Sequence, residues 1–189
     1  MVRPATSDEL LERAREAAGM RNVREAIRDI TLHALCSRSL TAGHVAVVAR
    51  TVGEGIRSCE VPPTAPVRET RHGAWAGLEE AVGQALQAIE SAARQFSEGR
   101  GSLTSTERDE ALAEFADLER SLGEGWEPPQ AMPAPLRARI ATVSALLTRT
   151  ETGEPAPPGA QEGAHVAGDS LSRAASGALR ALSGTIGDH

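Results

Sequence analysis

Four side chains in the first third of the sequence are of the types that bind metals or exchange electrons. His33 and Cys36 are three residues apart, and His44 and Cys59 follow them at wider intervals. Two cysteines and two histidines can hold zinc in a tetrahedral site, but compact zinc modules carry their ligands in close pairs on turns. This spacing instead favours small buried cysteines and partly exposed histidines on helix faces. We therefore expect no metal and no cofactor, and we keep a metal- or redox-linked function as a third hypothesis.

Acidic pairs are the other residues with catalytic potential, because two neighbouring carboxylates can divide acid and base roles between them. Glu79 with Glu80 and Asp109 with Glu110 are such pairs, but the apolar spacing around them places both on the polar faces of predicted helices. No serine follows the pattern of the sharp strand-to-helix turn that exposes a nucleophile. The closely spaced glycines also lack the spacing of a phosphate-binding loop. The sequence therefore predicts a protein that is not an enzyme and has no catalytic residues.

The overall charge and composition exclude several classes of function. The chain has 189 residues and a net charge of −6, and aromatic residues make up only 2% of it. Nucleic-acid binding needs a basic surface and usually aromatic platforms for the bases, so we expect no nucleic-acid partner. No apolar stretch is long enough to cross a membrane, the first residues lack the composition of a secretory leader, and two cysteines make no disulfide framework. These features predict a cytoplasmic protein.

Large apolar residues are scarce in this sequence, whereas small ones are abundant. Leucine, isoleucine, valine and phenylalanine together number 36, about 19% of the chain, while alanine alone numbers 33. Chains with less than about 20% of these four residues approach the composition of disordered proteins. Alanine buries little surface, so helices rich in it are weakly anchored. We therefore expect an elongated helical assembly and not a compact single core.

Apolar residues recur at helical spacing along almost the whole chain, which predicts an all-α fold. We expect an elongated antiparallel helical bundle or hairpin of five to six helices with a flexible C-terminal tail. Thr6 with Glu9 and Thr104 with Glu107 match the capping box that starts a helix. Gly19 bends or breaks the first helix. The later helices are predicted at residues 42–58, with Thr41 as N-cap, and at residues 67–98, 106–122 and 135–150.

Clusters of proline and glycine divide the sequence into three parts. Residues 1–60 are expected to form an N-terminal helical pair, and residues 66–150 a helical hairpin with a basic amphipathic helix. Residues 151–189 combine a linker rich in proline and glycine with a weak helical tail. This tail is expected to fold only with a partner, because its helix would contain several glycines.

The helix predicted at residues 67–98 carries a continuous stripe of apolar residues, close to that of a coiled coil. The short connection to the helix at 106–122 predicts that the two helices pack as an antiparallel hairpin. Small residues in the stripe would let helix backbones approach closely, within a bundle or between two copies. We expect this hairpin to self-associate or to bind another helical protein. The residues of this contact, the central seam, are Gly73, Trp75, Gly77, Leu78, Val82, Leu86, Ile89 and Phe96.

The helix predicted at residues 135–150 is basic on the side opposite its apolar face. Arg137, Arg139 and Arg149 could therefore bind an anionic lipid or granule surface. The alternative is that this helix docks on the acidic helix at 106–122. We favour docking, because the two helices carry charges of opposite sign.

Three short segments carry a resemblance to known proteins. They are residues 28–35, residues 47–56, and residues 77–82 with their continuation to Phe96. They resemble an uncharacterised family of proteobacterial alanine-rich helical proteins, a domain of unknown function. The resemblance covers roughly residues 10–122 and implies a helical protein without an established activity. The general character is similar to that of phasins, helical proteins that coat polyhydroxyalkanoate granules.

Three hypotheses of function follow from these features. The first is a non-enzymatic helical interaction or scaffold protein that self-associates. The second is a phasin-like protein that binds granule or membrane surfaces peripherally. The third is the metal- or redox-linked function of the two histidines and two cysteines. Each predicts a different surface of the folded chain as the functional one.

Overall fold

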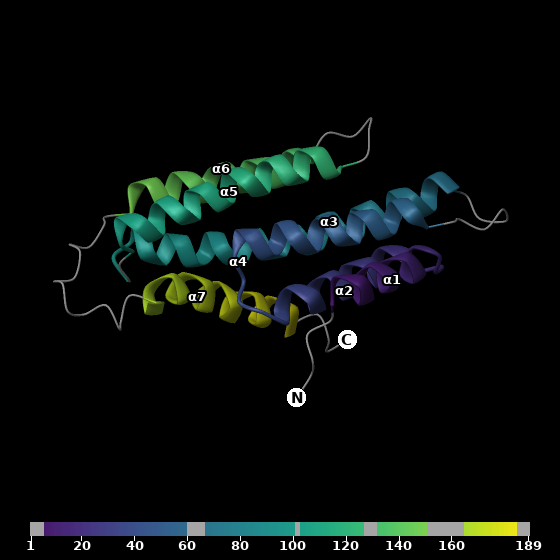
Figure 1. Cartoon of the computed structure of the whole chain (residues 1–189), viewed down its shortest axis with the longest axis horizontal. Coiled ribbons are helices and arrows are strands. Elements are labelled where there is room, and N and C mark those ends of the chain that lie inside the picture. Colours follow the sequence, from purple (N-terminus) through teal and green to yellow (C-terminus); the bar gives the residue numbers. More distant parts are fainter. Residues whose placement is uncertain (1–5, 60–66, 101–102, 127–131, 151–164, 185–189) are drawn as a thin grey trace.

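The computed structural model describes residues 6–59, 67–100, 103–126, 132–150 and 165–184 (Figure 1). These residues are almost all helical and contain no strand, which confirms the predicted all-α fold. The described helices are α1 (Ser7–Ala18), α2 (Val23–Cys36), α3 (Ala42–Ser58), α4 (Val67–Ser97), α5 (Ser105–Gly125), α6 (Ala134–Arg149) and α7 (His165–Gly184).

The helix starts predicted from the sequence are confirmed by their hydrogen bonds. The hydroxyl of Thr6 accepts from the amide of Glu9 at 3.3 Å, and the carboxylate of Glu9 accepts from the amide of Thr6 at 2.9 Å. The same reciprocal pair starts α5, and Thr41 caps α3. Gly19 ends α1 and does not merely bend it, so the described part of the chain contains seven helices.

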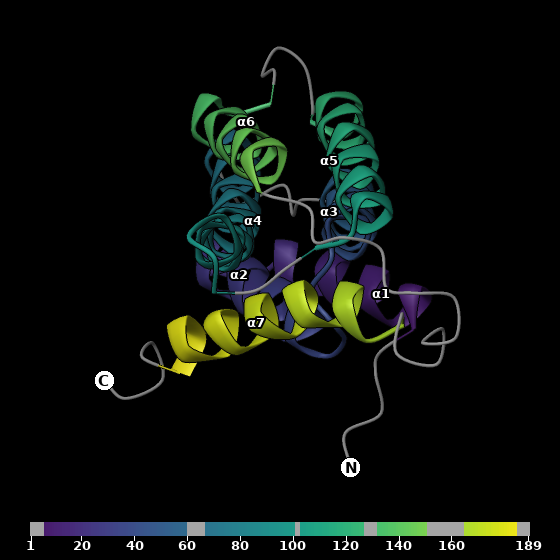
Figure 2. The same cartoon turned by 90° about the vertical axis from the view of Figure 1, so that its left-hand side faces the viewer.

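Helices α1 to α6 stack as two columns of three. Figure 2 looks along the helices and shows α1, α3 and α5 one above another beside a second column of α2, α4 and α6. Helix α7 crosses at the base of this stack and packs against α4 and α2. The middle helices α3 and α4 are therefore covered on more than one side, and the molecule is elongated along the helix axes (Figure 1).

Helices α4 and α5 do not pair as the short connection between them predicts. Helix α5 packs on α3 and α6, whereas α4 packs most extensively on α2, α6 and α7. The bundle is confirmed, but the direct pairing of the helices predicted at 67–98 and 106–122 is wrong. The physical reason is that the buried face of α4 is wider than its stripe of large residues, because alanines beside the stripe are buried as well, so helices from distant parts of the sequence cover it.

The described helices share one continuous apolar core, and the expectation that no compact core forms is wrong. Alanine makes this core possible. In α4, Ala81, Ala85, Ala88 and Ala92 have at most 1% exposed surface. Each buries little area, but small side chains let neighbouring helices approach until larger residues on both sides are closely packed. The core also runs across the boundaries between the three predicted parts of the sequence.

Glycines mark the closest approaches between helix backbones. A methyl group at Gly77 of α4 would lie 2.2 Å from the carbonyl oxygen of Arg24 in α2. A methyl group at Gly55 of α3 would lie 2.9 Å from the carbonyl oxygen of Leu11 in α1. Both distances are too short for a real contact, so these crossings require glycine. The small residues predicted to allow close packing therefore act inside the chain, between α4 and α2.

Helix α7 is the part of the predicted tail that the structure describes. It packs across α4, and its Ala175 and Leu179 are almost completely buried. The hydroxyl of Ser176 accepts a hydrogen bond from the amide of Leu40 at 2.9 Å. The tail helix thus has its partner within the same chain, whereas the linker at 151–164 lies outside the described residues.

Replacing Gly77 by alanine tests the crossing of α2 and α4. We expect Gly77→Ala to lower the free energy of unfolding by about 2–3 kcal/mol, because the new methyl group overlaps the Arg24 carbonyl and forces the backbones apart. Urea unfolding followed by circular dichroism measures this change. The control is Gly83→Ala, whose methyl group would meet Leu136 at an ordinary 3.6 Å. It should raise stability by up to about 1 kcal/mol through helix propensity, and equal effects of the two changes would contradict the crossing.

Candidate functional site

The structure places the central seam inside the chain's own core. Gly73 and Gly77 face α2, where added methyl groups would meet Val23 and Arg24. The large members of the seam, each at most 8% exposed, are Trp75, Leu78, Val82, Leu86, Ile89 and Phe96. The seam is therefore occupied by intramolecular packing, and a contact with a second molecule would use other surfaces.

The two tryptophans of the sequence form one buried pair. The ring centroids of Trp75 in α4 and Trp126 at the end of α5 are 5.1 Å apart, with the ring planes tilted by 45°. A methyl group at Gly53 of α3 would lie 3.2 Å from the Trp75 ring, so glycine at this position makes room for the indole. Trp75, expected as an interaction anchor, therefore anchors α3 and the end of α5 to α4.

The four candidate metal ligands are not brought together. His33 and His44 line the same pocket, but Cys36 faces α7, with its Sγ 3.9 Å from the hydroxyl oxygen of Ser183. Cys59 follows the last turn of α3, about 22 Å along the helix from His44. Among the described residues, no group of three or more histidines, cysteines, aspartates or glutamates could hold a metal ion. The geometry thus provides no common site for the metal or redox hypothesis.

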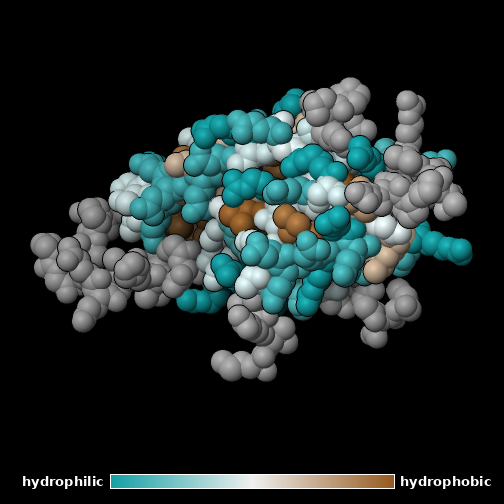
Figure 3. Space-filling view, turned by 45° about the vertical axis from the view of Figure 1, so that its right-hand side comes forward, coloured by the Kyte–Doolittle hydropathy of each residue, from teal (hydrophilic) through white to brown (hydrophobic). Residues whose placement is uncertain are grey.

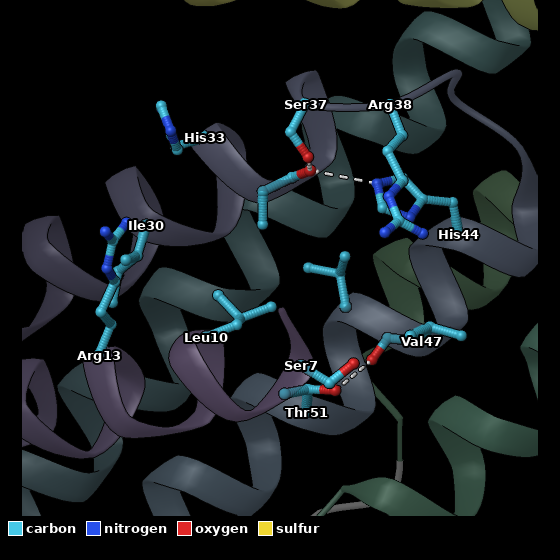
Figure 4. Close-up of a pocket in the computed structure, with 12 residues that line it drawn as sticks. Ser7, Leu10, Arg13, Ile30, His33, Ser37, Arg38, His44, Val47 and Thr51 are labelled. Carbon is cyan, nitrogen blue, oxygen red and sulfur yellow. Dashed lines mark hydrogen bonds between the residues drawn. The ribbon is translucent and has the colours of Figure 1, made fainter. Parts of the chain in front are cut away.

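The two histidines belong to a pocket between α1, α2 and the start of α3, which we call the basic pocket. Figure 4 shows Arg13 and His33 on one side of it and Arg38 with His44 on the other. Its cavity of about 70 Å³ has room for a few water molecules or one small charged group. Among the described residues, no carboxylate lines it. Hydroxyl groups complete the polar lining, from Ser7, Ser37 and Thr51.

Helical spacing in the sequence could have predicted only part of the lining of the basic pocket. His44 and Thr51 are seven residues apart on α3 and therefore share a face. Sequence reasoning names His33 and His44 only as possible metal ligands, and it misses Arg13 of α1 and Arg38, which follows α2. No spacing rule links residues on different helices, so only the packing of α1 on α2 and α3 brings the arginines to the histidines.

His44 is held by a hydrogen bond to the backbone of α2. Its Nε2 lies 3.1 Å from the carbonyl oxygen of Ala34, which also accepts from the hydroxyl of Ser37 at 2.6 Å. Burial lowers the pKa of His44 below its ordinary value of 6.5, and the charge of Arg38 lowers it further. The hydrogen bond to Ala34 opposes both effects. The half-buried imidazole is therefore neutral over a wider pH range than a histidine in water.

The basic residues of α6 divide between its buried and exposed sides. Arg139 forms a salt bridge with Glu90 of α4 at 3.0 Å, while Arg137 and Arg149 are exposed. The apolar stripe of α6 is buried, and α6 packs more extensively on α4 than on α5. The predicted docking on the acidic helix is therefore a minor contact, because the ion pair and most of the apolar contact go to α4.

Comparison with known proteins shows where the chain belongs. Residues 3–125 match the family of unknown function DUF6781. The chain belongs to this family. The match spans α1 to α5, and hence the whole basic pocket, whereas α6 and α7 lie beyond it. No curated protein and no solved structure matches the chain. In the described part of the chain, no helix is both long and apolar enough to span a bilayer.

The lowered pKa of His44 predicts how stability depends on pH. Because the folded state binds this proton less readily than the unfolded state, the free energy of unfolding should fall as the pH drops below about 6.5. The loss is measured by urea unfolding between about pH 7.5 and pH 5.5, above the range in which carboxylates titrate. His44→Gln should remove most of this slope, whereas the exposed His33→Gln should retain it. A slope unchanged in His44→Gln would contradict the assignment.

Proposed function

We propose that this protein is a non-enzymatic helical interaction protein that self-associates through the basic pocket. The observation that carries the proposal is the charge of the pocket. Two arginines and two histidines line it, and none of the described lining residues is a carboxylate, in a chain of net charge −6. A cavity of about 70 Å³ is smaller than a typical small-molecule site but can take one anionic group presented by a larger partner.

A second copy of the chain carries the complementary charge. Residues 101–127, which include α5, contain eight acidic residues and two arginines. Helices α1 and α5 lie in opposite outer layers with α3 between them (Figure 2). A chain therefore does not cover its basic pocket with its own acidic helix, whereas the acidic helix of another copy could reach it. Such a contact joins two different surfaces and would build rings or chains of copies.

The margin of the basic pocket also offers apolar contact. Val47 lines the pocket and is 42% exposed, one of two large hydrophobic residues among the described ones that are this exposed. The face of the molecule drawn in Figure 3 is mostly hydrophilic, with a few strongly hydrophobic atoms near its middle. Interfaces combine apolar area with charged groups at their margins in this way, which supports a docking role.

A cytoplasmic location is part of the proposal. Cys36 and Cys59 are both free thiols in the structure. Free thiols are typical of proteins that remain in a reducing compartment. The proposed self-association would therefore take place without disulfide bonds.

A phasin-like role at a granule or membrane surface is the second candidate. The exposed Arg137 and Arg149 of α6 favour it, because in the described part of the chain neither forms a salt bridge. The apolar face of α6 is buried in the bundle, so contact with a lipid surface would be electrostatic unless α6 detaches. This role uses α6, on the opposite side of the stack from the basic pocket (Figure 2).

Two double variants with the same change of charge separate these roles. Arg13→Glu with Arg38→Glu reverses the basic pocket, and Arg137→Glu with Arg149→Glu reverses α6. Each takes the net charge from −6 to −10. We expect light scattering after size exclusion to give a mass above the monomer for the wild type and the α6 variant at low salt, and a monomer for the pocket variant. High salt should also return the wild type to monomer, because exposed charge contacts are screened.

The outcomes of this experiment are distinct. A monomeric wild type at low salt, or equal association by both double variants, would refute self-association through the basic pocket. Flotation with anionic vesicles then tests the second candidate. Binding by the wild type that is lost in the α6 variant and kept in the pocket variant would support a surface role. No flotation of the wild type would exclude it.

A further inference from the structure

A second cavity lies on the other side of the α3 N-terminus, where α4, α5 and α7 meet. Its volume is about 240 Å³, more than three times that of the basic pocket. We call it the acidic groove, because glutamates of α5 form one wall and its described lining residues include no arginine or histidine. Its floor is apolar and is formed by Leu40, Ile89, Leu103, Phe115 and Leu171.

Three carboxylates follow one face of α5 along the acidic groove. Glu107, Glu110 and Glu114 occupy positions i, i+3 and i+7 of the helix and all line the cavity. Seven residues of helix place the first and last about 10 Å apart along the axis. The negative charge is therefore spread along a line and is not concentrated at one point.

The carboxylates have unused capacity to accept hydrogen bonds. Glu107 accepts through Oε2 from the amide and hydroxyl of Thr104, both at 2.8 Å, but its Oε1 is buried without a partner among the described residues. Glu114 accepts from the amide of Gly43 at 3.2 Å. None of the three lining carboxylates forms a salt bridge within the described residues. A buried acceptor without a donor is costly, so a donor that reaches Glu107 Oε1 would stabilise it, while the carboxylates of Glu110 and Glu114 are exposed and accessible to a ligand.

We propose that the acidic groove binds an aliphatic polyamine. The methylene chain would lie on the apolar floor, and its ammonium groups would donate to the carboxylates of Glu107, Glu110 and Glu114. A linear row of carboxylates about 10 Å long matches a chain with separated charges. A metal ion does not fit, because no three carboxylates among the described residues converge on one point. This inference goes beyond self-association, since it uses neither the arginines nor the histidines of the basic pocket.

Isothermal titration of the full chain with spermidine, an aliphatic triamine, tests the proposal. We expect saturable binding at about 0.1 M salt, where loosely held counterions are screened. The shorter diamine putrescine should bind several-fold more weakly, because it reaches fewer carboxylates. Magnesium at the same ionic strength should not compete. Equal binding by magnesium, or binding of an arginine-rich peptide without binding of spermidine, would overturn the proposal.

Matched variants of α5 locate the binding. Glu110→Gln with Glu114→Gln should weaken spermidine binding at least about tenfold, since each carboxylate supplies a charge-assisted hydrogen bond. Glu119→Gln with Glu124→Gln removes the same charge outside the groove and should leave binding unchanged. Because Glu114 also bonds to Gly43, the single variant Glu110→Gln, which breaks no described hydrogen bond, is measured as well and should weaken binding several-fold.

Two results would reject the assignment. Equal weakening by the groove variant and the control variant would show non-specific attraction to an acidic protein. Unchanged binding in Glu110→Gln would place the ligand elsewhere. The pocket variant Arg13→Glu with Arg38→Glu leaves the acidic groove intact and should not self-associate, so its binding of spermidine tests the groove separately from self-association.

Discussion

The contact between the backbones of α2 and α4 at Gly77 is the constraint on which the rest of the structure depends. Because a methyl group there would overlap the carbonyl of Arg24, the two helices cross at a distance that only glycine at this position allows. This distance brings the alanines of α4 within reach of neighbours on several sides, so side chains that bury little area one by one still form a core. Short distances between helices thus compensate for the scarcity of large apolar residues. Helix α4 is the helix on which α2, α3, α6 and α7 all pack.

Local features of this fold could be predicted from the sequence, whereas the pairing of helices could not. The caps at Thr6, Thr41 and Thr104 depend only on residues three positions away, and the structure has each of them. The helix on which α5 packs depends on which faces of α4 other helices already cover. A pattern of large apolar residues shows one stripe on α4, but alanine is also buried outside that stripe. Alanine is compatible with both buried and exposed positions, and this ambiguity concealed the width of the apolar surface.

The candidate sites show the same limit at the level of side chains. His33 and His44 could be recognised from the sequence as possible ligands, but which ligand they favour depends on the residues around them in the fold. Two cysteines beside them would favour a metal, whereas Arg13 and Arg38 favour an anion. The neighbours come from three elements and are set by tertiary packing alone. The three glutamates of the acidic groove were foreseeable as one helix face, yet the apolar floor that distinguishes a groove from a solvated stripe comes from α4, α7 and the connections near α3 and α5.

The first turn of α3 links the two sites. Thr41 and Ala42 line the acidic groove, and His44 lines the basic pocket, so one wall serves both cavities from opposite sides. The amide of Gly43 between them donates to Glu114 of the groove, while the His44 ring bonds to α2. The first turn of α3 therefore separates the basic pocket from the acidic groove. Since Thr41 holds that start by capping it, the separation of charge across the molecule depends on a local hydrogen bond that the sequence alone predicts.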